Sequence, residues 1–158
     1  MKKKPSNKTL SVSAIKEGTV IDHITAGSAL KIIRLLNLPA DKKTVTVGLN
    51  LPSRILGRKD IIKVSGREVT SQEANKIAVL APQASINVIK NYKIIKKFLV
   101  QIPQKIEGVI VCPNPQCVTN HESTASIFLA EQHKYLVQLH CQYCEKMYTV
   151  DQIHEYHT

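Results

Sequence analysis

Apolar and polar positions alternate with two different periods in the first two-thirds of the chain. A period of two, as in Leu10-Ser-Val-Ser-Ala14 and Thr44-Val-Thr-Val47, predicts strands with one buried face. A wide apolar stripe with the helical period, carried by Ile32, Ile33 and Leu36, predicts an amphipathic helix. The predicted elements are, in order, a strand over 10–24, a helix over 26–38, strands over 44–51 and 61–64, a helix over 70–80 and a strand over 84–95.

Local signals mark the ends of these helices. Thr70-Ser-Gln-Glu73 is a capping box, which satisfies free backbone N–H groups at a helix start, and Pro82 ends that helix. Thr25 or Ser28 is expected to cap the first helix. The order β-α-β-β-α-β predicts the ferredoxin-like fold, an antiparallel sheet covered by helices on one face. The uncovered face is then available to a ligand or a partner.

The last third of the chain has a different pattern. Short apolar stretches precede Cys112 and cover 126–130 and 135–141, which predicts a small all-β unit. We therefore expect an α+β protein made of three segments. These are a flexible basic tail over 1–9, a ferredoxin-like domain over 10–103 and a small all-β metal-binding domain over 104–158.

All four cysteines of the chain lie in the last segment. Cys112 and Cys117 form a C-x4-C pair, and Cys141 and Cys144 form a C-x2-C pair. Four thiolates make a soft tetrahedral cage that suits Zn²⁺, with iron as the alternative metal. Two disulfides or four buried thiols are the other readings, and disulfides are rare in the cytosol. Four Cys ligands leave no open position for water, so the predicted zinc is structural.

Charge is divided unevenly between the two predicted domains. Residues 1–103 carry 19 Lys and Arg against 6 Asp and Glu, a balance of +13. Residues 104–158 carry 3 Lys against 6 Asp and Glu, a balance of −3. A zinc ribbon that binds a nucleic-acid backbone is expected to be basic. The metal-binding domain is therefore expected to dock on a protein, and a phosphate-bearing ligand is expected on the first domain.

Several classes of protein are disfavoured by the sequence. No apolar run is long enough to span a membrane, and no signal peptide is recognisable, so we expect a cytoplasmic protein without a membrane partner. Asp22 and His23 suggest a catalytic pair, but adjacent residues of a strand point to opposite faces. No P-loop, G-x-G-x-x-G motif or nucleophile elbow is present. We therefore expect a chain that is not an enzyme.

Five lysines of the basic domain stand on predicted strands or at their ends. Such cations, beside a carboxylate and backbone amides, hold the phosphates of a nucleotide, although a solvated basic face is the alternative. Nucleic-acid binding by a zinc-ribbon protein stays open as well, but aromatic residues for base stacking are scarce, at 4%. A small zinc enzyme would need an open metal position. The five are Lys59, Lys63, Lys93, Lys96 and Lys97.

Several blocks of sequence accompany the cysteines in a fixed order. They are Gly18-Thr-Val-Ile-Asp-His-Ile24, Val47-Gly-Leu-Asn-Leu-Pro-Ser53, Gly57-Arg-Lys-Asp-Ile-Ile-Lys63, Ala81-Pro-Gln-Ala-Ser-Ile-Asn87, Asn91-Tyr92, Ile106-Glu-Gly-Val109, Cys112-Pro-Asn-Pro-Gln-Cys117 and Cys141-Gln-Tyr-Cys-Glu-Lys146. In this combination the chain resembles the regulatory chain of aspartate carbamoyltransferase. A four-cysteine site alone is shared by many folds, whereas its combination with these blocks is specific.

The resemblance implies a non-catalytic, allosteric subunit in pyrimidine biosynthesis. It implies that CTP, assisted by UTP, inhibits and that ATP activates, with Mg²⁺ as a candidate companion ion. It also implies that the zinc domain docks on the catalytic chain. Dimers of the regulatory chain would then tie two catalytic trimers together, with no nucleic acid as a partner.

The resemblance further implies the residues of the nucleotide pocket. Lys63 would contact the ribose or base, Tyr92 the base and Lys97 the phosphates. The zinc ligands would be the four cysteines at 112, 117, 141 and 144. The expected nucleotide-binding residues are Val12, Ile15, Val20, Asp22, His23, Ile61, Lys63, Asn87, Ile89, Tyr92, Ile94 and Lys97.

Overall fold

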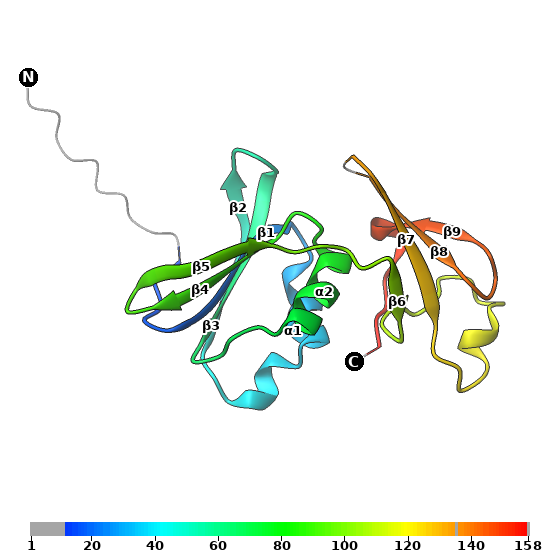
Figure 1. The fold of residues 1–158 in the computed structure, drawn as a ribbon, viewed down its shortest axis with the longest axis horizontal. Helices are drawn as coiled ribbons and strands as arrows, with labels where there is room; N and C mark the ends of the chain where they lie inside the picture. The colour runs from blue at the N-terminus through cyan, green and yellow to red at the C-terminus, as the bar shows by residue number, and fades with distance from the viewer. Residues whose placement is uncertain (1–11, 135, 158) are drawn as a thin grey trace, which may run out of the picture.

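A computed structural model describes residues 12–134 and 136–157 of the 158-residue chain. Two antiparallel sheets follow one another along the chain and lie side by side (Figure 1). The architecture is α+β, as predicted, and the first six regular strands and α-helices follow the ferredoxin-like order β-α-β-β-α-β. The predicted tail over 1–9 lies outside the described residues.

The N-terminal sheet has the strand order β2-β3-β1-β4-β5. Both α-helices cover one of its faces (Figure 1), where Ile21, Ile62 and Ile86 belong to the buried core. The elements of this part are β1 (Gly18–Thr25), α1 (Ala29–Leu35), the 3-10 helix η1 (Leu38–Asp41), β2 (Val45–Ser53), β3 (Gly57–Ser65), α2 (Ser71–Leu80), β4 (Ser85–Lys90) and β5 (Lys93–Leu99).

The C-terminal sheet has the order β6-β7-β8-β9, of which β9 was not predicted. Phe128, Leu139 and Ile153 are fully buried there, and one cluster of buried side chains includes residues of both sheets. None of the helices in the described ranges is long and apolar enough to cross a membrane. The elements are β6 (Lys105–Glu107), the 3-10 helix η2 (Val118–Asn120), β7 (Ile127–His133), β8 (Leu136–Cys141), β9 (Met147–Thr149) and the 3-10 helix η3 (Val150–Gln152).

The first strand begins later than the predicted residue 10. Residues 12–17 are irregular, and β1 starts at Gly18, which has a φ of +135°. A Cβ at this position would lie 1.9 Å from the carbonyl oxygen of Val64 on β3. The chain therefore enters the sheet at a point where only glycine fits.

The predicted single strand over 84–95 is wrong, because the chain forms two strands, β4 and β5. It reverses direction at Asn91 and Tyr92, whose φ angles of 50° and 64° are both positive, as in a type I′ hairpin turn. Phe98 and Leu99, which lie beyond the predicted strand end at residue 95, belong to β5. This additional strand forms one edge of the sheet.

The two helices differ in how well the sequence predicted them. The first is shorter than the predicted 26–38, since Asn37 adopts a left-handed conformation with φ 50° and a 3-10 turn follows. The second begins with the predicted capping box. The Thr70 hydroxyl accepts a hydrogen bond from the Glu73 N–H, and the Glu73 carboxylate accepts one from the Thr70 N–H.

Ser28, one of the two predicted residues, occupies the N-cap position of α1, but its side chain makes no capping hydrogen bond, and Asp60 supplies the cap. Its fully buried carboxylate accepts hydrogen bonds from the backbone N–H groups of Gly27 at 2.9 Å and Ala29 at 3.2 Å. It also accepts one from the Asn50 N–H at 3.0 Å. One side chain of β3 therefore fixes both the β1–α1 turn and the neighbouring part of β2.

Candidate functional site

The sulfur atoms of all four cysteines meet at one point, where they lie within 4.8 Å of one another. The Sγ atoms of Cys112 and Cys144 are 3.7 Å apart, and those of Cys117 and Cys141 are 3.8 Å apart. A disulfide would need about 2.05 Å, and the four thiols are free. A tetrahedral ion with metal–sulfur bonds of about 2.3 Å separates its ligand sulfurs by about 3.8 Å. The four cysteines therefore fit a metal ion.

Local hydrogen bonds shape the first cysteine turn. The carbonyl of Asn114 accepts from the Cys117 N–H at 3.0 Å, and the Asn114 side-chain oxygen accepts from the Gln116 N–H at 3.1 Å. The Asn120 amide donates to the Asn114 carbonyl at 2.8 Å, and the Thr119 hydroxyl lies 3.2 Å from the Cys117 sulfur. The sequence reading missed these supports. Asn114 could have indicated this turn, because the side chain of an Asn in a turn often accepts a hydrogen bond from the backbone two residues further along the chain.

The thiols differ in acidity. Burial raises the pKa of Cys112 and of Cys141. Burial also acts against ionisation of Cys144, but hydrogen bonds from the Lys146 N–H and the Asn114 side chain lower the pKa of Cys144 to about 7. At neutral pH the Cys144 thiol is thus partly ionised to the thiolate, which is the form that binds metal.

The strand register aligns four of the expected nucleotide-binding residues in one row. Lys63 pairs with Val20, Val20 with Asn87, and Asn87 with Lys97. Directly paired residues of neighbouring strands point to the same face of a sheet. The alternate residues Ile21, Ile62 and Ile86 are in the helix-covered core, so this row lies on the opposite face. (We call this the open face.) Two ammonium groups thus flank one amide.

Lys63 is buried, with 8% of its surface exposed. Burial lowers its pKa. Its ammonium group donates to the carbonyls of Val12 at 3.1 Å and Ser13 at 2.8 Å, so the N-terminal stretch crosses the open face. The contact is close, since a Cβ on Gly48 would lie 2.8 Å from a methyl of Val12 and 2.9 Å from one of Ile61.

Asn87 carries a buried polar atom without a partner. Asn87 is 5% exposed, and its amide nitrogen donates to the Val20 carbonyl at 3.3 Å. Its side-chain oxygen has no hydrogen-bond partner among the described residues. An unsatisfied buried acceptor costs about 1–3 kcal/mol. A ligand donor would satisfy this acceptor only after neighbouring side chains move, because the oxygen is buried.

Asp22 and His23 lie close together, contrary to the prediction that they point to opposite faces. A bulge in β1 and a left-handed φ of 55° at His23 break the alternation, and the His23 N–H donates to the Asp22 carboxylate at 2.7 Å. The Lys59 ammonium lies 2.8 Å from the same carboxylate. Burial alone would raise the pKa of Asp22, but the hydrogen bonds from Lys59 and the His23 N–H lower it below its usual value.

The expected apolar and aromatic residues of the pocket differ in how deeply they are buried. Ile15 and Ile89 are half-buried, whereas Tyr92 and Ile94 are 66% and 59% exposed at the β4–β5 hairpin. The Tyr92 N–H donates to the carbonyl of Lys16 at 3.0 Å. The hairpin tip thus lies beside the N-terminal stretch that carries Ile15.

The lysines that were predicted to form one cationic group do not all lie on the same face of the sheet. Lys59 and Lys63 alternate along β3 on the open face, where Lys97 joins them through its pairing with Asn87. Lys96 pairs with Val88 instead, on the other face, and its ammonium lies 5.3 Å from the Phe98 ring centroid. Lys96 is therefore a natural control for charge effects at Lys97 and Lys63.

Two family models match the chain. Residues 10–101 match "Aspartate carbamoyltransferase regulatory chain, allosteric domain". Residues 104–154 match "Aspartate carbamoyltransferase regulatory chain, metal binding domain". The first match includes the open face, and the second includes all four cysteines.

Curated relatives agree with these matches. A protein of Thermococcus kodakarensis is 49% identical over 145 residues, which cover 91% of this chain and 95% of the relative. One of Pyrococcus horikoshii is 47% identical with the same coverage, and one of Chromobacterium violaceum is 43% identical over 93% of this chain and 97% of the relative. Each of the three is named aspartate carbamoyltransferase regulatory chain.

Proposed function

The chain belongs to the family of aspartate carbamoyltransferase regulatory chains, and on this premise we propose that its open face binds nucleoside triphosphates as allosteric effectors. CTP, assisted by UTP, acts as the inhibitor of pyrimidine biosynthesis, and ATP acts as the activator. The chain is the regulatory, non-catalytic subunit, so its effect appears in the catalytic chain.

The observation that carries this proposal is the row of Lys63, Asn87 and Lys97 on the open face. Lys97, the exposed end of the row, meets the phosphates, where a cation makes charge-assisted hydrogen bonds. Lys63 contacts the ribose or base. The free oxygen of Asn87 accepts from an amino group, which both cytosine and adenine carry. Mg²⁺ is the companion ion that a triphosphate brings.

The remaining expected residues complete the pocket in this proposal. Asp22 and His23 at the bulge form its polar end, and Tyr92 supplies an exposed aromatic face against the base. The apolar neighbours exclude water from the ribose and base. They are Val12, Ile15, Val20, Ile61, Ile89 and Ile94.

We also propose that the metal is a single structural Zn²⁺ held by the four cysteines. Four sulfur ligands at tetrahedral separations match zinc and leave no coordination position open. The ion holds the turn after β6 to the β8–β9 turn. Reduced thiols are needed for this site, and we accordingly place the assembly in the cytoplasm.

The metal-binding domain is proposed to dock on the catalytic chain. Apolar side chains near the cysteine turns are exposed, with Val118 at 38%, Tyr143 at 40% and Met147 at 50%. Aromatic residues and Met are enriched at protein interfaces. A dimer of this chain would carry two such surfaces and so link two catalytic trimers.

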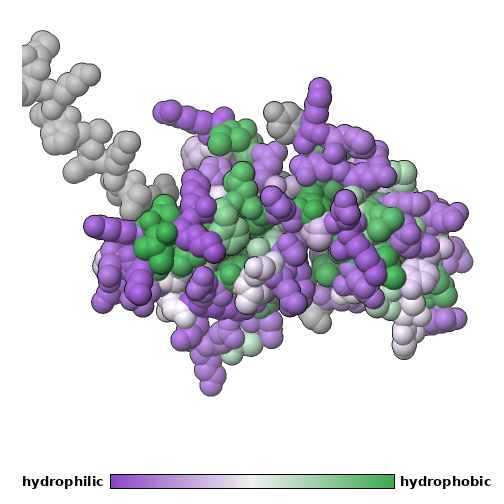
Figure 2. Space-filling model, in the orientation of Figure 1, coloured by the Kyte–Doolittle hydropathy of each residue, from purple (hydrophilic) through white to green (hydrophobic). Residues whose placement is uncertain are grey.

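The dimer is proposed to form through the edge strand β5. Ile95 and Leu99 are exposed there by 60% and 68%, and hydrophobic surface lies among hydrophilic side chains on this part of the molecule (Figure 2). An exposed apolar edge strand favours association with a second chain.

Replacing Ile95 by Lys is expected to convert the dimer to a monomer of 17.6 kDa, because the charge cannot be buried at the interface. Sedimentation of the full chain measures this mass. Leu30→Lys is the matched control, since Leu30 is 55% exposed on α1 at a distance from β5, and it should stay dimeric. A wild-type chain that sediments as a monomer would remove the dimer from the proposal.

The proposed effector function is tested in an assembly reconstituted from this chain and the catalytic chain. CTP is expected to raise the aspartate concentration at half-saturation, and ATP to lower it, because each nucleotide has a different affinity for the two states of the assembly. The catalytic chain alone should not respond. An assembled complex whose aspartate saturation is the same with CTP, with ATP and without nucleotide would refute the function.

A further inference from the structure

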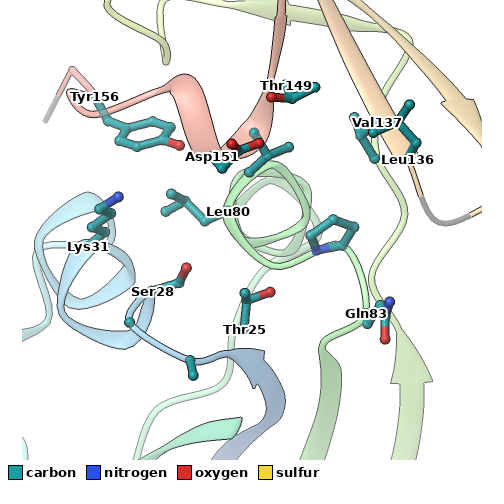
Figure 3. A pocket seen from close by; sticks show the side chains of 14 residues that line it. Thr25, Ser28, Lys31, Leu80, Gln83, Leu136, Val137, Thr149, Asp151 and Tyr156 are labelled. Carbon is teal, nitrogen blue, oxygen red and sulfur yellow. The ribbon is translucent and has the colours of Figure 1, made fainter. Parts of the chain in front are cut away.

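A cavity of about 480 Å³ lies between the two parts of the molecule, away from the open face (Figure 3). One wall is the β1–α1 turn over 25–28, with Lys31 on α1 and Leu80 at the end of α2. The facing wall comes from the metal-binding part, chiefly β8, Asp151 in η3 and Tyr156. The cavity therefore separates the proposed effector domain from the proposed docking domain.

Opposite charges stand on the two walls. Lys31 projects from the basic part and Asp151 from the acidic part (Figure 3). Within the described ranges, neither takes part in an ion pair of 4.0 Å or less. The Tyr156 hydroxyl beside them is buried without a hydrogen-bond partner there, and burial raises its pKa, so it is a protonated donor. Each wall of the cavity thus carries a charged side chain that has no ion-pair partner among the described residues.

The first wall is continuous with the open face. β1 runs from the bulge at Asp22 directly into the turn over 25–28. Asp60 on β3 holds this turn through the N–H of Gly27, and the adjacent Lys59 forms an ion pair with Asp22. A displacement of Asp22 or Lys59 at this bulge therefore acts on the strand segment that leads into the turn.

We propose that this cavity is an adjustable joint between the two domains, and that its closure brings Lys31 and Asp151 into an ion pair. The proposal rests on the proposed effector function, whose signal it carries to the metal-binding domain. Binding at the open face moves the β1–α1 turn and α1 with it, so the separation of the two charges differs between the CTP-bound and the ATP-bound states. The ion pair favours the state in which it forms, and it thereby adds to the coupling between nucleotide and docking domain.

Charge reversal in the reconstituted assembly tests the joint. The measured quantity is the ratio of half-saturating aspartate with CTP to that with ATP. Lys31→Glu and Asp151→Lys are each expected to reduce this ratio about two- to fivefold, the range that one partly exposed ion pair supplies. The double variant Lys31→Glu with Asp151→Lys restores the opposite pair and is expected to recover the response. Lys42→Glu, on the exposed η1 end of the same domain, should respond like the wild type.

A second measurement detects the pair directly. A carbodiimide joins an ammonium and a carboxylate that are in contact, and mass spectrometry of the assembly is expected to find a Lys31–Asp151 link whose yield differs between CTP and ATP. Absence of this link with both nucleotides, or a double variant as unresponsive as the single ones, overturns the joint. A wild-type assembly that responds while all variants respond equally also overturns it and leaves the effector function intact. An unresponsive wild type refutes the effector function itself, and the joint with it.

Discussion

Removal of the metal, or replacement of Cys141 by Ala, is expected to unfold the metal-binding domain and to abolish assembly with the catalytic chain. Structural Zn²⁺ contributes about 10–16 kcal/mol to the folding of small zinc domains, which is as large as the whole net stability of an ordinary domain. Cys141 is fully buried and its sulfur contacts that of Cys117, so an alanine leaves three ligands and an incomplete cage. The first domain keeps its own helix-covered core and is expected to stay folded.

Hydrogen exchange of the full chain measures this effect domain by domain. Amides of β7 and β8 should lose protection in chelator, whereas those of β1 and β3 should keep it. Metal analysis should find one zinc ion per wild-type chain, and added zinc should restore the chelated wild type but not the Cys141→Ala variant. Ser123→Ala, an exposed substitution in the same domain, is the control. Assembly that persists in chelator would contradict the structural role of the ion.

Lys63→Met is expected to weaken CTP binding about 100-fold, or by about 3 kcal/mol, the upper end for a single charge-assisted contact. The large effect follows from burial. Lys63 is 8% exposed, so water and salt screen its charge far less than that of the exposed Lys97. Met keeps the apolar stem and removes the ammonium that also binds the carbonyls of Val12 and Ser13.

Calorimetric titration of the full chain with CTP measures this change. Lys96→Met is the matched control, because it removes the same charge from the other face of the sheet and should bind CTP nearly as the wild type does. Equal affinities of Lys63→Met and wild type would remove Lys63 from the site. Equal losses in the two variants would show a general charge effect in place of a local contact.

Features with local causes could be predicted from the sequence. The capping box at Thr70 and Glu73 needs only four adjacent residues, and it forms as expected. Alternation along the chain gave the ferredoxin-like order, because one face of each strand must be buried. The spacing of the four cysteines likewise indicated a metal cluster, since ligand geometry restricts which spacings can converge.

Features that depend on distant residues could not be predicted. The bulge that brings the side chains of Asp22 and His23 together depends on the pairing between β1 and β3. The residues around the bulge do not indicate it. Asp60 supplies the cap of α1 from more than 30 positions away, so the residues around Ser28 could indicate the N-cap position but not the group that satisfies it. The hairpin between β4 and β5 was missed for another reason. Tyr92 is not a typical turn residue, and the alternation of Ile86 and Val88 continues in the same phase at Tyr92 and Ile94.

That tyrosine has a thermodynamic consequence of its own. A bulky side chain in the left-handed region costs roughly 1–2 kcal/mol, which glycine in the same turn would not incur. Tyr92 recovers little of this by burial, because 66% of its surface faces solvent. The hairpin is therefore less stable than the same turn with glycine at this position would be. The left-handed backbone sets the direction of the Tyr92 Cα–Cβ bond, so in the proposed pocket this part of the ring's placement is made during folding, before any nucleotide binds.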